Sequence, residues 1–462
     1  MKIATLVLSI LFPMAAHAET LSAEAIYYRC YAQLTGHRAA DNDPMLAKLR
    51  AGQVKASDAC MDLLDSAKLA RSQNDYLKLA KNSEEGRAVL ARMQELHTTF
   101  FAERTFNVPN VALAPIGGLL DVMDPGSSAL YYTRALLGPN VQASSIVTYN
   151  RALRPFRTDM NPAKGLFRKV NRGGFYYTNG WRFAPQGELL GLEEMPGGSE
   201  KLTGPGVSID ISRTLGGGFL GSGAYLMQSV NDDFEFETNV AKMPRRWATA
   251  VFRDVLCREF PVVRLEDAKS FVRPQSPLPF RQEQACNQCH SSMDRIGSVL
   301  RNFHYSYFDN KALIPPDKRG AMFFKTFAAD KPAEAGWPDR QDNDFKNRPT
   351  RGTLYFRSAT DGSLEKPTIS SVHDLGQKMA AQDDFYLCIA NRYYDYFTAK
   401  GIKLDDAKVL NDLAAKDKTG ALKKRLDTVK TLARELKKTQ SLRGLVEDII
   451  RSPEYSDSAF GQ

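Results

Sequence analysis

Apolar residues recur three or four positions apart through the first hundred residues, which is the spacing of amphipathic helices. Two such sets are Ala23, Ile26, Tyr27, Cys30 and Leu34, and then Met61, Leu63, Leu64, Leu69 and Leu79. The pattern is mixed over residues 98–165, where Ser128 to Leu137 is helix-like. We therefore expect a mainly helical N-terminal domain that covers residues 19–200.

The second half of the chain shows further helical patterns and one proline-rich stretch. Trp247 to Leu256 predicts an apolar helix, and residues 258–285 are predicted to be extended. From Val372 the pattern is helical again. A heptad-like stripe on a basic helix, one member of an expected antiparallel helix pair, consists of Leu422, Leu426, Val429, Ala433 and Leu436. Leu442 to Ile450 predicts a last amphipathic helix, which Ser452-Pro453 should end.

Two turn signals predict β-hairpins between these helices. Phe175 to Phe183 is rich in aromatic residues around Asn179-Gly180, and Tyr355 to Ile369 surrounds Asp361-Gly362. The expected fold class is therefore mainly α with short β-hairpins, in which a helical N-terminal region precedes a C-terminal domain.

A glycine-rich stretch, residues 215–221, contains a formal G-x-G-x-x-G pattern. A dinucleotide site needs this pattern between the strand and the helix of a βαβ unit, and the surrounding sequence shows no such unit. We expect instead a flexible turn that leads into a helix over Phe219–Met227.

The N-terminus has the features of a secretory signal peptide over residues 1–18. Lys2 gives a positive start, Ile3 to Phe12 is an apolar run, and Ala16-His17-Ala18 is an A-x-A cleavage site. The run is shorter than the roughly 20 residues that cross a membrane. We therefore expect an exported mature chain in the periplasm, with no transmembrane segment.

The charge balance adds little to this description. Lys and Arg outnumber Asp and Glu by 62 to 53, which gives a net charge of +9. Export argues against nucleic acid as a partner. An acidic protein or a membrane surface is an alternative partner, but a solvated basic surface explains the excess more simply.

Residues 286–290 read Cys-Asn-Gln-Cys-His, the C-x-x-C-H signature of c-type haem attachment. Two thiols three positions apart at the start of a helix can form thioethers with both vinyl groups of one porphyrin. The adjacent histidine then supplies the proximal nitrogen to iron. A redox dithiol, a structural disulfide or half of a zinc site would use the same cysteines, but the sequence has neither a second Cys/His pair nor a βαβ context. We expect one covalent haem c on Cys286, Cys289 and His290.

Four cysteines remain, and an oxidising compartment favours pairing an even number of them. Three pairings are possible, and the sequence does not choose among them. We expect Cys30–Cys60, which would close a small helical unit, and Cys257–Cys388, which would join the flanks of the haem segment. The alternative is four buried thiols.

The region from about residue 205 to 458 resembles the planctomycete-type cytochrome c proteins, exported proteins of largely unassigned function. The segment that begins at Cys286 reads C-N-Q-C-H-S-S-M-D-R-I-G-S-V-L-R-N-F and is similar to the family pattern C-x-x-C-H-x-x-M/I-D-P-I/L-G-x-x-x-E-N-F-D. The other similar segments are 216–226, 245–257, 383–388 and 445–455. The resemblance implies a cytochrome c-like haem domain over residues 205–462, and its two terminal cysteines match Cys257 and Cys388.

The iron ligands follow from the motif only in part. His290 is the expected proximal ligand, with its other ring nitrogen donating to a backbone carbonyl. Met293 is three residues later and is interpreted as core. Met322, in a loop-like stretch, is the preferred distal ligand, and the alternatives are an open site or a ligand among His304, His373 and Met379.

These features favour a mono-haem carrier that exchanges electrons with a redox partner protein. A haem enzyme of the peroxidase or oxidase type, with an open distal site, is the alternative. Di-haem peroxidases carry two C-x-x-C-H motifs, whereas this chain has one. The N-terminal region is larger than a simple electron carrier needs. A third hypothesis is therefore a scaffold or binding protein with structural or sensory haem.

Overall fold

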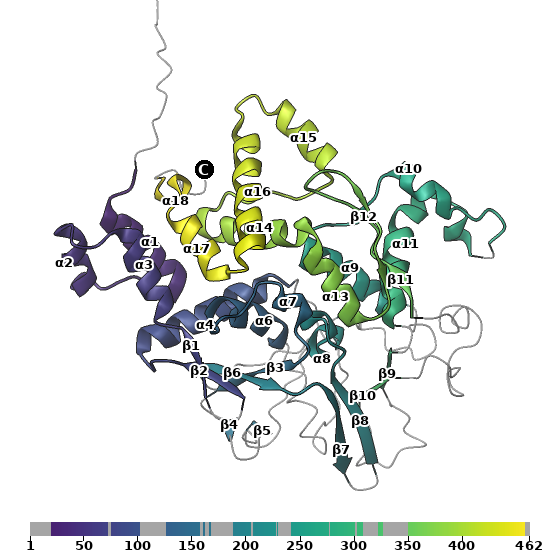
Figure 1. Ribbon diagram of the computed structural model, residues 1–462, viewed down its shortest axis with the longest axis horizontal. Coiled ribbons are helices and arrows are strands. Elements are labelled where there is room, and N and C mark those ends of the chain that lie inside the picture. The colour runs from purple at the N-terminus through teal and green to yellow at the C-terminus, as the bar shows by residue number, and fades with distance from the viewer. Residues whose placement is uncertain are drawn as a thin grey trace, which may run out of the picture.

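The structure is a computed structural model, and its helices are the main elements (Figure 1). The residues that it describes are 20–72, 75–101, 126–157, 160–161, 166–167, 188–204, 207–227, 229, 242–276, 278–300, 303–307, 322–326 and 350–457. The predicted signal peptide at 1–18 and the predicted hairpin at 175–183 lie outside these ranges.

Helices span most of the described chain, as the sequence pattern predicts. Those before residue 230 are α1 (Ala23–Thr35), α2 (Pro44–Arg50), α3 (Ala56–Asp65), α4 (Glu84–Thr99), α6 (Ser127–Leu137), α7 (Ser145–Thr148) and α8 (Gly223–Met227). Those after it are α9 (Lys242–Leu256), α10 (Leu265–Ala268), α11 (Gln284–Gly297), α13 (Val372–Ala381), α14 (Asp383–Thr398), α15 (Ala407–Lys416), α16 (Ala421–Thr439), α17 (Leu442–Ile450) and α18 (Pro453–Ser456). Single 3₁₀ turns are η1 (Gly218–Gly221), η2 (Lys269–Phe271), η3 (Pro279–Arg281) and η4 (Ser298–Leu300).

The largest sheet has four antiparallel strands in the order β1 (Leu69–Arg71), β2 (Tyr76–Leu79), β6 (Leu189–Met195) and β3 (Ala152–Arg157). It packs against α4 and α6 (Figure 1). The helical interpretation of Leu69 and Leu79 is therefore wrong, because both lie in strands. Short apolar runs do not distinguish helix from strand by spacing, and the partner strand β6 comes from more than a hundred residues later.

The remaining strands form short antiparallel pairs. They are β4 (Met160–Asn161) with β5 (Leu166–Phe167), β7 (Gly198–Gly204) with β8 (Val207–Thr214), β9 (Phe303–Tyr307) with β10 (Met322–Thr326), β11 (Gly352–Thr353) with β14 (Thr368–Ile369), and β12 (Phe356–Arg357) with β13 (Leu364–Glu365). The pair β12–β13 encloses Asp361-Gly362, where Gly362 has a φ of 80°. This pair is the hairpin that the Asp-Gly signal predicts.

Residues 258–285 are not simply extended, which corrects the prediction made from their prolines. They contain α10, η2 and η3. The carboxylate of Asp267 accepts a hydrogen bond of 3.0 Å from the backbone N–H of Arg264 and so caps the first turn of α10. Pro274 stands in a turn and Pro279 at the start of η3, positions that tolerate proline.

The main core is a cluster of buried residues that extends from Tyr27 to Tyr455 and includes residues on both sides of the predicted domain boundary near residue 200. Helix α6, whose eleven residues are all buried, lies near its centre and packs against α4, β3 and η1. Such a helix, buried around its whole circumference, is typical of the interior of a large protein. The division into domains at 19–200 and 205–462 stays a prediction.

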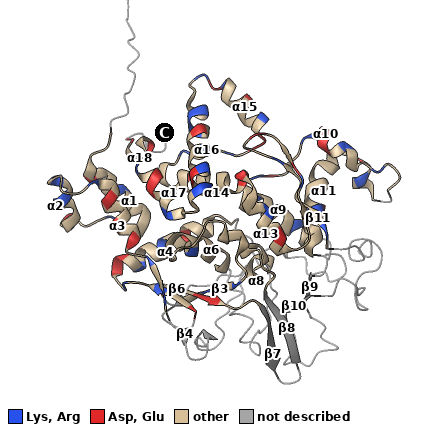
Figure 2. Ribbon diagram, viewed as in Figure 1, with Lys and Arg blue, Asp and Glu red and all other residues tan. Residues whose placement is uncertain are grey.

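Basic side chains gather along α16, which Figure 2 shows as a series of blue segments. Leu426, Val429, Ala433 and Leu436 on the opposite side are buried, so the heptad-like stripe is the face that packs against α14. The net positive charge of the chain is thus partly a property of one solvated helix face, as the sequence indicates.

Candidate functional site

The C-x-x-C-H motif lies in the first two turns of α11, and the two residues between its cysteines hold these turns in place. Asn287 is buried, and its side-chain amide donates to the carbonyl of Glu283 at 2.9 Å and to that of Arg281 at 3.2 Å. Gln288 donates to the carbonyl of Val263 at 3.2 Å. Both contacts fasten the start of α11 to the segments that precede it.

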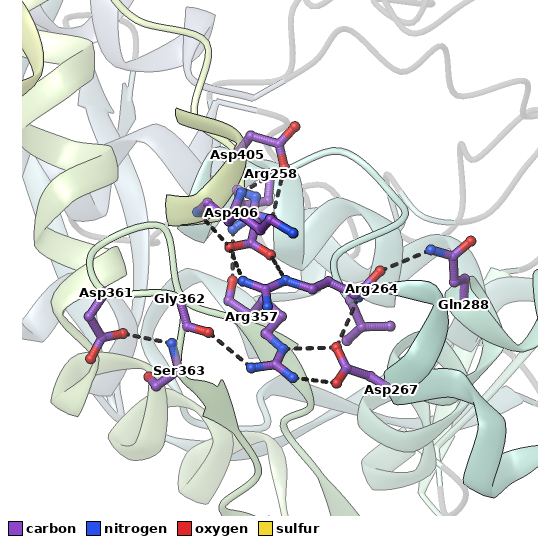
Figure 3. Close-up of polar contacts among 12 residues, drawn as sticks. Arg258, Arg264, Asp267, Gln288, Arg357, Asp361, Gly362, Ser363, Asp405 and Asp406 are labelled. Atoms are coloured by element: carbon purple, nitrogen blue, oxygen red, sulfur yellow. Dashed lines mark hydrogen bonds and ion pairs between the residues drawn. The ribbon is translucent and has the colours of Figure 1, made fainter. Parts of the chain in front are cut away.

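The segment around Val263, to which Gln288 donates, is held in place by a network of arginines and aspartates (Figure 3). Arg357 makes a two-point ion pair with Asp267, in which Nε donates at 2.8 Å. Arg264 pairs in the same way with Asp406, at 2.5 and 2.9 Å. The hydrogen bond from Arg357 holds the pKa of Asp267 below its usual range, although burial raises it. Paired guanidinium and carboxylate groups are geometrically specific, so they fix the surroundings of the motif.

The two thiols of the motif lie three positions apart on α11, which places them on the same side of the helix. Cys286 is exposed, Cys289 is half-buried, and both are free. Burial, and after it the proximity of Cys286, raises the pKa of the Cys289 thiol. Reactive dithiols have lowered thiol pKa values, so this environment differs from that of a redox-active pair.

The imidazole of His290 lies one residue further on and is held on two sides. Its Nδ1 is 3.1 Å from Oδ2 of Asp294, one turn later on the same helix. Phe280 of η3 stacks on the ring, with 4.2 Å between centroids and 28° between planes. Among the described residues, no partner hydrogen bonds to Nε2. The expected backbone carbonyl is therefore wrong as the partner of His290, since a carboxylate at the i+4 position takes that place.

Asp294 is also bound by Arg245 of α9. Its carboxylate accepts from Nε of Arg245 at 2.7 Å and from a terminal nitrogen at 3.2 Å. Burial raises the pKa of Asp294, but the hydrogen bonds from His290 and Arg245 outweigh it and hold the pKa below its usual range. The guanidinium of Arg245 also lies 5.1 Å from the centroid of the Phe280 ring. His290, Asp294, Arg245 and Phe280 thus form one contact group.

The far end of α11 is packed closely against β11. A Cβ atom on Gly352 would lie 1.9 Å from the carbonyl oxygen of Arg295, so this approach requires a glycine.

Two disulfides are present. Cys257, just after α9, is joined to Cys388 of α14, and Cys30 is joined to Cys60. Both pairings are those expected from the sequence.

The candidates for a distal ligand are on two different parts of the fold. Met322 begins β10, which pairs with β9, the strand that carries His304. The interpretation of Met322 as a loop residue is therefore wrong. Met379 on α13 is fully buried in the core, and His373 is half-buried on the same helix.

Met293 packs against the core, and its sulfur accepts a hydrogen bond of 3.5 Å from the hydroxyl of Thr249. Its interpretation as core is confirmed.

The glycine-rich stretch at 215–221 serves packing. Gly216, Gly217 and Gly218 all have positive φ angles, and a Cβ on Gly218 would lie 1.9 Å from the carbonyl oxygen of Ile146. Gly216 and Gly217 form the turn before η1, which begins at Gly218, and the structure has this 3₁₀ turn followed by α8 instead of a continuous helix from Phe219.

The described residues contain no group of three or more His, Cys, Asp or Glu side chains arranged to hold a metal ion. In the same ranges, no helix is both long enough and apolar enough to span a membrane.

No family model, no curated protein and no solved structure matches the chain. The resemblance to the planctomycete-type cytochrome c proteins therefore stays a prediction that depends on the motifs quoted above.

Sequence reasoning missed several residues that now define the site. Asp294 had a local signal, because a residue four positions after His290 on a helix lies beside it. Arg245 and Phe280 had none, since their contacts depend on how α9 and η3 pack against α11. The two residues between the cysteines, Asn287 and Gln288, also act through tertiary contacts.

Proposed function

We propose that the protein is an exported mono-haem c-type cytochrome that exchanges electrons with a redox partner protein. Cys286 and Cys289 would form the thioethers to the porphyrin, and Nε2 of His290 would bind the iron. When bound, haem supplies one-electron chemistry by cycling between Fe(III) and Fe(II).

The observation that carries this proposal is the donor set on α11. Two free thiols and an imidazole lie within one turn on one side of the helix, and Nδ1 of that imidazole is already engaged by Asp294. The engaged Nδ1 fixes the tautomer, so that Nε2 carries the lone pair. These residues fit a covalent haem in number, spacing and chemistry.

The chain's own residues have separate tasks in this proposal. Cys286 and Cys289 bind the cofactor, His290 supplies the iron ligand, and Asn287 and Gln288 keep the first turns of α11 in place. For the second axial position we propose Met322. Its strand, β10, pairs with β9, which follows α11 and η4 directly along the chain.

The disulfides support the proposed location. Two such bonds, Cys30–Cys60 and Cys257–Cys388, are typical of proteins in oxidising compartments. We propose that the chain is exported to the periplasm by residues 1–18 and that residues 205–462 form a cytochrome c-like domain of the planctomycete type.

A haem enzyme with an open distal site is the second candidate, and one observation favours it. A carboxylate such as Asp294 accepts the Nδ1 proton more strongly than a neutral carbonyl does, because charge-assisted hydrogen bonds are stronger. A more basic imidazole donates more electron density to iron, which suits the activation of a bound oxidant.

The test is the visible spectrum of the periplasmically expressed protein, oxidised and reduced, with haem staining after denaturation. We expect covalent haem in the wild type and in the double variant Cys30→Ser/Cys60→Ser, and none in Cys286→Ser/Cys289→Ser. The first double variant is the matched control, since it also removes two cysteines. A wild-type protein without covalent haem contradicts the proposal.

The same spectra separate the two candidates. A weak far-red band of a methionine–iron bond that disappears in Met322→Ala would support the electron carrier. A high-spin spectrum that Met322→Ala leaves unchanged would support the open site of a haem enzyme.

A further inference from the structure

We propose that Asp294 and Arg245 are a positioning pair that sets the reduction potential of the iron held by His290, with opposite effects. This inference rests on the proposed haem function.

The geometry links three groups in a row. Nδ1 of His290 is 3.1 Å from one oxygen of Asp294, and the same carboxylate accepts two hydrogen bonds from Arg245, at 2.7 and 3.2 Å. The side chains of Asp294 and Arg245 are 26% and 33% exposed, so solvent screens the pair only in part. A substitution of Arg245 should therefore affect His290, because it changes how strongly the carboxylate of Asp294 attracts the Nδ1 proton.

Phe280 makes this arrangement rigid. Its ring stacks on His290, and the guanidinium of Arg245 lies 5.1 Å from its centroid. The imidazole is thus held by a ring on one face and by a carboxylate at Nδ1. Such second-sphere contacts orient the ligand and raise its basicity.

The direction of each effect follows from charge. Asp294 draws the Nδ1 proton toward itself, which makes the imidazole more electron-rich and stabilises Fe(III) over Fe(II). Arg245 occupies part of the same carboxylate and so weakens its pull on that proton. Removing the charge of Asp294 should raise the reduction potential, whereas removing the charge of Arg245 should lower it.

The experiment measures the reduction potential of the purified haem protein by spectroelectrochemistry in three variants. Loss of a partner of a metal ligand typically changes metal affinity or activity 10- to 100-fold. A tenfold change in the equilibrium constant of a one-electron couple is about 59 mV. We expect Asp294→Asn to raise the potential by at least that amount and Arg245→Met, which keeps an unbranched stem, to lower it. The control Glu283→Gln removes an exposed charge just before the same helix and should shift it much less.

A vibrational measurement separates the hydrogen bond from simple electrostatics. In resonance Raman spectra of the reduced protein carrying Met322→Ala, which leaves the iron five-coordinate, the iron–histidine frequency should fall in Asp294→Asn, recover in Asp294→Glu and stay unchanged in Glu283→Gln. If Asp294→Asn loses haem, Arg245→Met decides alone: a lower potential supports the inference, and an unchanged one overturns it.

Two kinds of failure are distinguishable. A wild-type protein without haem contradicts the proposed function and removes the basis of this inference. Haem in every variant, with potentials that do not differ or that shift in the same direction for Asp294→Asn and Arg245→Met, leaves the proposed function intact and overturns the inference.

Discussion

His97 on α4 is a fully buried histidine whose two ring nitrogens both have partners. Nδ1 is 2.8 Å from the hydroxyl of Thr133, and Nε2 is 2.7 Å from the hydroxyl of Tyr393. Thr133 donates its own proton to Gln94 at 2.7 Å. Thr133 therefore accepts from Nδ1–H, and Tyr393 donates to Nε2. The contacts define one neutral tautomer and leave no site for a second ring proton.

This environment makes the stability of the protein depend on pH. Burial lowers the pKa of His97 to about 3, whereas the unfolded chain has the ordinary value of about 6.5. The unfolded state thus binds a proton first as the pH falls, and stability that is fully present above pH 6.5 is lost toward pH 3. We expect a loss of about 1 kcal/mol between pH 7 and pH 5.5, measured by urea unfolding.

The matched comparison uses two histidine variants. His97→Gln should abolish the pH dependence in that window, although it lowers the stability at pH 7 because Tyr393 and Thr133 lose a partner. His37→Gln alters an exposed histidine and should leave the dependence as it is in the wild type. An equal slope in His97→Gln and the wild type would show that other groups cause it.

At the residue scale, the sequence predicts features that are close together along the chain. Cys286, Cys289 and His290 are recognisable because the haem attachment proposed for them requires a fixed spacing within five residues. The two histidines differ in how far away along the chain their partners lie. Asp294 is one helical turn away from its histidine, whereas Tyr393 is almost three hundred residues away and reaches His97 only through the packing of α14 against the earlier helices.

At the scale of elements, the disulfide Cys257–Cys388 joins the end of α9 to α14. It closes a loop of sequence separation 131, whereas Cys30–Cys60 closes one of 30 within the first three helices. The longer loop contains the candidate haem site, because residues 286–290 lie between the two cysteines, and helix α9 also packs against α11. In the chain-entropy account, a longer closed loop constrains the unfolded state more.

We therefore expect the two disulfides to contribute unequally to stability. Cys257→Ala/Cys388→Ala should lower the free energy of unfolding by about 4–5 kcal/mol, and Cys30→Ala/Cys60→Ala by about 3–4 kcal/mol. Chemical denaturation of both double variants under identical conditions provides the comparison. A larger loss from the shorter loop would mean that local packing of α1 against α3, and not loop length, determines the effect.

Elements with a long periodic pattern were predictable, and those that depend on distant partners were not. Helices α16 and α17 match the predicted ranges because their apolar stripes are long and continuous. The sheet β1–β2–β6–β3 was missed, since its strands are three to seven residues long and come from segments more than a hundred residues apart. In residues 258–285 the prolines led to a prediction of extended chain and α10 was missed. Its capping residue, Asp267, also forms an ion pair with the distant Arg357.

At the scale of the whole molecule, the first helix is bound to the last ones. Gln33 of α1 donates to the carbonyl of Phe397 at 3.2 Å and accepts from the hydroxyl of Tyr455 at 2.8 Å. The guanidinium of Arg29 binds the carbonyl of Tyr455. Tyr455 itself is fully buried in the cluster that begins at Tyr27. The two predicted domains therefore share their interior.

This shared core predicts that the protein unfolds as one unit and not as two domains. In calorimetry we expect a single transition whose calorimetric and van't Hoff enthalpies agree, and in hydrogen exchange the amides of α1 and α14 should open with the same free energy. Tyr455→Phe, which removes only the hydroxyl bound to Gln33, should lower both values together by about 1 kcal/mol. Two transitions, or a loss confined to α1, would instead support separate domains on either side of residue 200. The candidate haem site would then belong to a unit that is stable without α1, whereas a single transition means that weakening a contact of Tyr455, 165 residues beyond His290, also weakens the helix that carries His290.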